Sequence, residues 1–261
     1  MKKEGIGLLL IGHGASLGGG GAVRRLAERL GQDEAFDQVA ACFWKETPYV
    51  GEGLKLITSP IVLAIPVFAT EGRIARDLIP AEMGLQGPLT LLSDGRSVHY
   101  LRPIGVHPGL ARLVEERAEL AAMAASFDFK ATALLLVAHG NRQGGGAKAS
   151  AEGLAAQLLK AGRWAEVRVC FLEEEPRAAD WQCSIKTRQI VVLPMLLAEG
   201  QHAARDLPPL FGLKELGGAD PVLTEFGGYR LAITQGLVDD QALETLIRRM
   251  VQETLSRPSP R

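Results

Sequence analysis

Three histidines follow apolar runs of the sequence. His13 comes directly after "IGLLLIG", His139 after "TALLLVA", and His202 a few residues after "IVVLPMLL". Neutral imidazole is a good ligand for Co, Fe, Ni or Zn, and two imidazoles over one crevice hold a metal while leaving coordination positions open. His139 and His202 therefore predict a metal site, with Asp206 or nearby backbone fixing the tautomer of His202.

Each histidine also has a structural interpretation. A histidine at the end of an apolar strand can be a core residue whose ring bonds a backbone carbonyl, and His202 can simply flank or cap the following helix. The same His-Gly pair at two equivalent strand ends, at residues 13–14 and 139–140, favours a function. Inherited packing explains the repetition as well, so both interpretations stay open on spacing alone.

Three familiar glycine motifs fit less well. A dinucleotide fingerprint needs glycine at Leu17, and a phosphate-binding loop needs Ser or Thr after Lys148, where the chain has alanine. Residues 14–18, "GASLG", do match the nucleophile elbow of α/β-hydrolases, with Ser16 as nucleophile. The second copy of this stretch has Asn141-Arg142 there instead. A serine hydrolase thus remains the weaker alternative.

The chain reads as two copies of one domain. After the His-Gly pairs, "ACFWKETP" matches "VCFLEEEP", "IPVFATEG" matches "LPMLLAEG", and "ARDLIP" matches "ARDLPP", always in the same order. Such ordered self-similarity is typical of an internal repeat. We place the boundary near Phe127, which gives a first copy at residues 1–126 and a second at residues 127–261.

The elements that position the histidines alternate between strands and helices. Within each copy, a near-continuous apolar run leads through glycines into an amphipathic stretch, "AVRRLAERLG" or "SAEGLAAQLLKAG". Such runs joined by helical crossovers indicate parallel strands covered on both faces. The predicted fold is two tandem three-layer α/β/α domains with parallel sheets. In such sheets, ligands bind beyond the carboxyl ends of the strands.

Composition argues against several classes of binding partner and indicates a location. The net charge is −1 and no Lys/Arg cluster occurs, so we expect no nucleic-acid partner. No 18-residue apolar span or signal peptide is present, so we expect no membrane partner. The three cysteines, Cys42, Cys170 and Cys183, have no C-x-x-C spacing, which favours a reducing, cytoplasmic location. A fused repeat can replace a homodimer, so a monomer or weak homodimer is expected.

At this point the residues resemble a family. A strand followed by His-Gly, a strand ending in Phe-Leu-Glu with proline three residues on, and Gly-x-His-x-x-x-Asp-Leu-Pro are similar to the class II tetrapyrrole chelatases, the sirohydrochlorin cobaltochelatases and ferrochelatases of the CbiX type. The resemblance covers nearly the whole chain. It implies a fused two-copy chelatase that inserts Co²⁺ or Fe²⁺ into sirohydrochlorin for cobalamin or siroheme biosynthesis.

Carried over residue by residue, the resemblance makes His139 and His202 the metal-binding pair, with Glu173 as the acidic residue between them. The divalent metal is a substrate, Ni²⁺ is a further option, and no organic cofactor is implied. The first copy keeps His13, has Lys45 in place of the glutamate and lacks the second histidine. This reverses the arrangement of many fused members, in which the first copy is the complete one.

The implied substrate carries eight carboxylates, which a chain of net charge −1 must bind with local cations. Arg142 and Lys148 follow His139 and are our candidates, and Arg205 is a further residue in reach. In the degenerate first copy, Lys45, Arg73 and Arg76 could reach carboxylates at the junction between the copies. The alternative function is a non-catalytic chelatase-like protein that binds a metal or a tetrapyrrole.

Overall fold

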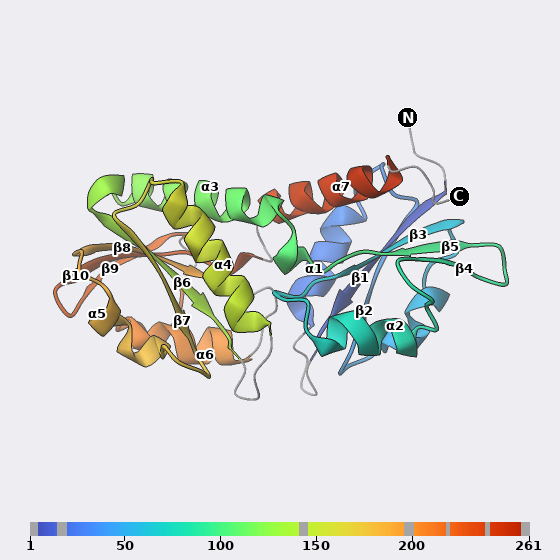
Figure 1. Cartoon of the computed structure of the whole chain (residues 1–261), viewed down its shortest axis with the longest axis horizontal. Coiled ribbons are helices and arrows are strands. Elements are labelled where there is room, and N and C mark those ends of the chain that lie inside the picture. The colour runs from blue at the N-terminus through green and yellow to red at the C-terminus, as the bar shows by residue number, and fades with distance from the viewer. Residues whose placement is uncertain are drawn as a thin grey trace. The chain divides into compact units, whose positions relative to one another are not determined.

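Two sheets with the same strand order form the framework of the protein (Figure 1). The computed structural model describes residues 5–14, 20–140, 146–195, 201–217, 220–237 and 241–256, without the side chains of residue 147 and residues 201–205. Within these ranges, the sheets have the orders β2-β1-β3-β5-β4 and β7-β6-β8-β10-β9. The identical orders confirm the internal repeat at the level of topology.

The strands of the first sheet are β1 (Ile6–Gly12), β2 (Gln38–Phe43), β3 (Ile61–Pro66), β4 (Leu89–Leu91) and β5 (Ser97–Tyr100). Those of the second are β6 (Thr132–Ala138), β7 (Glu166–Phe171), β8 (Gln189–Pro194), β9 (Val222–Phe226) and β10 (Tyr229–Ile233). The two tandem α/β domains are confirmed. Each parallel sheet, however, carries one antiparallel edge strand, β4 against β5 and β9 against β10.

Helices and short helical turns connect the strands. The first half contains α1 (Gly21–Leu30), η1 (Val50–Lys55), the π-helical turn η2 (Ile74–Leu78), α2 (Ile79–Glu82), η3 (Ile104–Val106) and α3 (Gly109–Ala124). The second half contains η4 (Phe129–Ala131), α4 (Ala147–Lys160), η5 (Ala178–Asp180), α5 (Trp181–Ser184), α6 (Gln201–Leu210) and α7 (Gln241–Leu255). None of these described helices is long and apolar enough to cross a membrane.

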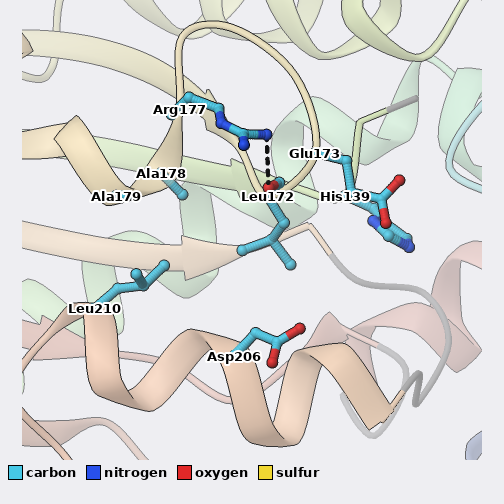
Figure 2. Close-up of a pocket in the computed structure, with 8 residues that line it drawn as sticks. All are labelled: His139, Leu172, Glu173, Arg177, Ala178, Ala179, Asp206 and Leu210. Atoms are coloured by element: carbon cyan, nitrogen blue, oxygen red, sulfur yellow. Dashed lines mark hydrogen bonds between the residues drawn. The ribbon is translucent and has the colours of Figure 1, made fainter. Parts of the chain in front are cut away.

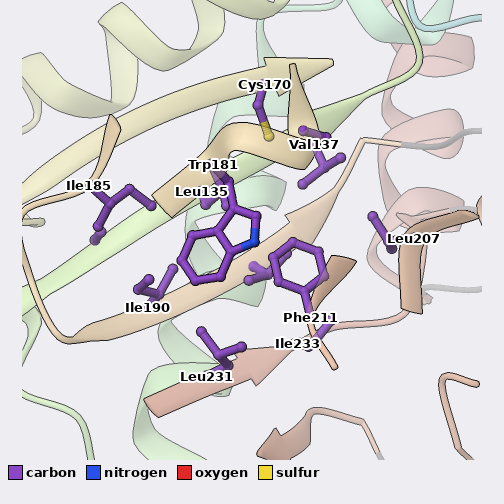
Figure 3. Close-up of a cluster of buried hydrophobic side chains, with 13 residues drawn as sticks. Leu135, Val137, Cys170, Trp181, Ile185, Ile190, Leu207, Phe211, Leu231 and Ile233 are labelled. Carbon is purple, nitrogen blue, oxygen red and sulfur yellow. The ribbon is translucent and has the colours of Figure 1, made fainter. Parts of the chain in front are cut away.

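The centre of the second sheet is apolar on both faces because helices cover both. Every residue of β6 is buried. Alternate residues Leu135 and Val137 pack with Trp181 and Phe211, which come from α5 and from the end of α6 (Figure 3). The indole N–H of Trp181 donates to the Leu210 carbonyl at 3.0 Å, so its polar atom is satisfied in the core. Helices α3 and α4 contact the strands as well and form the other layer.

The two compact units of the structure do not meet at the predicted domain boundary after residue 126. One unit comprises residues 1–107 and 238–261, and the other comprises residues 108–237. Both sheets lie within the expected halves, but the helix after each sheet belongs to the other unit. Helix α3 contacts β8, β10 and α4, whereas α7 is bonded to the first unit. The boundary at residues 126 and 127 therefore separates the sheets and not the compact units.

Ion pairs hold α7 in the first unit. The Glu244 carboxylate, only 7% exposed, accepts from Arg29 Nε at 2.6 Å. Arg248 donates to Asp33 and lies 3.4 Å from Glu244. Arg29 is on α1 and Asp33 follows it, so this network fastens α7 to the α1 region. His107 contributes a further contact in this unit, with its Nε2 3.2 Å from Glu253 Oε2.

Candidate functional site

Backbone hydrogen bonds place His139 and Glu173 next to each other. The parallel pairing of β6 and β7 continues past the ends of both strands: Leu172 N–H donates to the Ala138 carbonyl and Glu173 N–H to the His139 carbonyl, both at 3.0 Å. Both side chains therefore emerge at the carboxyl edge of the sheet. His139 is exposed and Glu173 is half-buried, so His139 is not a core histidine.

Gly140 explains why glycine follows the histidine. Its φ is +81°, in the left-handed region, and a Cβ there would meet Glu174 Cγ at 2.9 Å and Phe171 Cβ at 3.1 Å. Gly14 in the first half has φ +69° and the same neighbours by position, Glu46 and Phe43. Glycine thus lets the chain turn away directly after the histidine while passing close to the end of the neighbouring strand.

His139 and Glu173 line one pocket of about 340 Å³ (Figure 2). Its walls come from the ends of β6 and β7, the turn η5 and helix α6. Besides the two predicted residues, the lining contains Arg177, Asp206 and the apolar residues Leu172, Ala178, Ala179 and Leu210. Figure 2 shows Asp206 on α6, across the pocket from Leu172. The pocket therefore combines acidic, basic and imidazole groups over an apolar floor.

Two of these charged residues were not predicted as binding groups. Asp206 was expected only to support His202, and Arg177 was not singled out. A signal for Arg177 was available, because its equivalent in the first copy is Tyr49: the isolated bridges Phe43–Tyr49 and Phe171–Arg177 match. Aligning the two copies of the repeat would have shown a positively charged residue at this position in the second copy only.

Several predicted residues fall outside the described parts. Arg142 and Ser16 lie in undescribed segments, and the side chains of His202 and Arg205 are not described. The backbone at His202 does belong to α6, the helix that carries Asp206. Among residues with described side chains, no group of three or more His, Cys, Asp or Glu could hold a metal ion.

Lys148 lies on α4 and is not among the pocket-lining residues in the described part of the chain. Its ammonium donates to the Glu175 carbonyl at 2.7 Å and lies 6.0 Å from the centre of the Phe171 ring. It thereby joins α4 to the turn between β7 and η5.

The nearby thiol is not available as a ligand. Cys170 is buried on β7, and this burial raises the pKa of its thiol to about 12. Because the sulfur is enclosed in the core, a metal ion in the pocket does not reach it. The same holds for Cys42 in the first half, where burial also raises the thiol pKa to about 12.

The first half repeats the backbone of the site with different side chains. Trp44 N–H donates to the Gly12 carbonyl at 3.0 Å and Lys45 N–H to the His13 carbonyl at 2.9 Å, so Lys45 occupies the place of Glu173. The His13 ring is half-buried, with Nδ1 2.9 Å from the Gly14 carbonyl oxygen, and it makes a T-shaped contact with the Phe68 ring. The first half thus has a cationic residue at the position where the second half has a carboxylate.

The two predicted arginines of the first half are both exposed. Arg76 makes two hydrogen bonds to the neighbouring Asp77 carboxylate, at 3.0 and 2.9 Å, and they lower the pKa of Asp77. Arg73 precedes the π-helical turn η2. The Asp77 carboxylate therefore already neutralises much of the charge that Arg76 would offer to an external carboxylate.

Sequence comparison points to one family. The CbiX family model matches residues 7–121 and again residues 133–254. The chain is 28% identical over 221 residues to a probable sirohydrochlorin cobaltochelatase of Halobacterium salinarum. The aligned region covers 77% of this chain and 75% of that protein.

Solved structures share the fold. A multi-domain Deinococcus radiodurans protein, described as structurally similar to chelatases, has a TM-score of 0.74 and 26% identity over 94% of this chain; the match spans 54% of that protein. CbiX, described as the terminal enzyme of siroheme biosynthesis in denitrifying bacteria, has a TM-score of 0.70 and 21% identity, covering 96% and 100% of the two chains. The chelatase SirB from Bacillus subtilis subspecies spizizenii, in complex with cobalt, has a TM-score of 0.67 and 15% identity, covering 97% and 96%.

Proposed function

The chain belongs to the CbiX family, and from this premise we propose that it is a metal chelatase that inserts Co²⁺ or Fe²⁺ into sirohydrochlorin. The observation that carries the proposal is the exposed His139 beside Glu173 in a pocket whose opposite wall is helix α6. The relatives named above include a probable cobaltochelatase and a cobalt complex of SirB. Imidazole ligands accept cobalt, iron and nickel alike, so the metal is a matter for experiment.

We place the second metal ligand at His202. Positions 202 and 206 are four residues apart on α6 and therefore share one face of the helix. Asp206 lines the pocket from that helix, which supports His202 as the partner of His139. Two imidazoles hold a divalent metal firmly yet release it to the four ring nitrogens.

Metal insertion exchanges two pyrrole N–H protons for one divalent cation. Glu173 is our candidate to accept these protons, directly or through water, because it lines the same pocket as His139 and is only partly shielded from solvent. Holding the macrocycle against the bound metal supplies a further part of the rate enhancement. Arg142 and Lys148 remain candidates for binding substrate carboxylates at the rim.

Replacing each proposed group tests the site. With Co²⁺ and sirohydrochlorin in excess, we expect repeated turnover by the wild type. The change in the absorbance of the macrocycle measures this turnover. His139→Ala, His202→Ala and Glu173→Gln should each lose about 100-fold or more of kcat. The matched control is His13→Ala, the equivalent histidine of the first half, which should keep its activity.

The outcomes separate this proposal from its alternatives. A wild-type protein that stops after one equivalent of product is a binding protein and not a chelatase. Full turnover in His202→Ala contradicts the proposed ligand pair. Loss of activity in His13→Ala alone would move the site to the first half.

The three cysteines lie in the described part of the chain and form no disulfide there, which supports a reducing compartment, and we propose the cytoplasm. The fused repeat supports a monomer. Sedimentation of the purified protein at several concentrations tests the assembly.

A further inference from the structure

Arg177 brings a positive charge into the pocket of His139. It immediately precedes η5, is half-buried, and lines the pocket together with Glu173 and Asp206. Among the described lining residues it is the only Arg or Lys. The other ionised groups of that lining are carboxylates, which repel an anionic substrate, so Arg177 is the group there that attracts one.

The guanidinium retains donors for a ligand. Its Nη1 donates to the Leu172 carbonyl at 3.4 Å (Figure 2), which is long for an N–H···O bond. The contact between Arg177 and the Glu175 carboxylate, at 3.1 Å, uses the backbone N–H and not the side chain. Within the described residues, no carboxylate pairs with this guanidinium. A guanidinium has five N–H donors, so the single long bond leaves most of them to be satisfied from the pocket.

The cation belongs to one half of the repeat only. The backbone is the same in both: Phe171 N–H donates to the Pro176 carbonyl at 2.9 Å, and Phe43 N–H to the Pro48 carbonyl at 2.8 Å. Yet the position after the proline is Arg177 in the second half and Tyr49, which is 49% exposed, in the first. Because the same turn forms around tyrosine, the fold does not require arginine there. The arginine accompanies the half that carries the proposed metal ligands.

We propose that Arg177 anchors a carboxylate of the tetrapyrrole and selects for macrocycles with acidic side chains. This inference rests on the proposed function. A planar guanidinium binds a carboxylate through two parallel hydrogen bonds, which fixes orientation as well as position. An acid group held at Arg177 sets one edge of the macrocycle on the wall next to Glu173. The ring nitrogens are then presented to the metal on the His139 side of the pocket.

The test compares the acid substrate with its neutral methyl ester. Binding of each macrocycle to the intact, metal-free protein is measured by absorbance titration for the wild type, Arg177→Gln, Arg177→Lys and the control Arg188→Gln. Arg188 is exposed and precedes β8, at the opposite edge of the sheet, so its replacement removes the same charge far from the pocket.

For sirohydrochlorin, we expect Arg177→Gln to raise Kd about tenfold or more and Arg177→Lys to recover part of the loss, since lysine keeps the charge but not the paired geometry. The ester should bind all variants equally. Arg188→Gln should match the wild type.

Three results overturn the inference. Unchanged sirohydrochlorin binding by Arg177→Gln shows that the guanidinium holds no carboxylate. An equal loss for acid and ester shows that Arg177 only shapes the turn. Wild-type protein that binds and metallates no sirohydrochlorin overturns both this inference and the proposed function, whereas the first two results leave the proposed function standing.

Discussion

The site is assembled by a few residues whose types follow from their backbone positions. His139 reaches solvent because it is the first residue beyond a buried strand, and Gly140 turns the chain away. Glu173 is fixed beside it by the backbone bond between the two residues. The chemistry that we propose therefore depends on a position next to the histidine that carries no side chain.

Gly140→Ala tests this dependence. We expect it to lower the free energy of unfolding by about 1–2 kcal/mol through left-handed strain, and further through the close approach of a Cβ to Glu174 and Phe171. Metal insertion should fall as well, because His139 shifts with its neighbour. Gly162→Ala is the matched control: its φ is +69° but nothing lies within 4 Å of its Cβ position. A Gly140→Ala variant that equals Gly162→Ala in both stability and activity would show that the close contact is unimportant.

At the scale of elements, α6 carries one wall of the pocket and is seated on the core by its apolar residues. Leu207 lies on α6 and Phe211 just beyond it, and both pack in the cluster that contains Trp181, which is 2% exposed. We expect Trp181→Ala to lower the free energy of unfolding by about 3–5 kcal/mol and to reduce activity in the surviving folded protein. Trp181→Phe keeps most of the volume but leaves the Leu210 carbonyl without its donor, and should cost about 1–2 kcal/mol. Urea denaturation and parallel activity assays measure both effects. Unchanged activity of folded Trp181→Ala would show that the pocket does not depend on the packing of this core.

The sequence predicts which segments form strands and helices better than it predicts which sheet each helix packs against. The apolar runs of β1 and β6 indicate buried parallel strands, as found. The pocket lined by His139 lies at the carboxyl end of β6, where the repeated His-Gly pair predicts a site. The antiparallel edge strand β4 escapes prediction because it has three residues and its Leu91 is 77% exposed. The buried residues of α3, among them Leu110, Leu113 and Val114, lie at helical spacing, but this spacing carries no information on which sheet buries them.

At the scale of the whole molecule, the exchange of α3 and α7 makes the chain order differ from the order of the compact units. A cut at the sequence boundary after residue 126 would leave residues 1–126 without α7 and residues 127–261 without α3. We expect the two fragments expressed apart to be unstable and, expressed together, to associate into an active protein. Size-exclusion chromatography of the co-expressed fragments measures this, and a stable, monomeric fragment 127–261 would contradict it.

The attachment of α7 should also depend on pH. The hydrogen bond from Arg248 is the largest of the effects that hold the pKa of Asp33 below its usual value. Its folded pKa is thus lower than its unfolded pKa of about 3.9. The stabilisation is fully present above the unfolded value and is lost as the pH falls through the folded one. Asp33 is 21% exposed, so Asp33→Asn should lower the free energy of unfolding at pH 7 by about 1 kcal/mol.

Because the wild-type carboxyl also becomes neutral in acid, the difference between wild type and Asp33→Asn should shrink below about pH 3.9. Urea unfolding across this range measures the difference. Arg248→Gln should remove most of the same pH dependence, since it deletes the donor that lowers the pKa of Asp33. If Asp33→Asn changes stability equally at pH 7 and in acid, the ion pair does not hold α7 in place, and its attachment would have to come from apolar packing through residues such as Leu243 and Ile247.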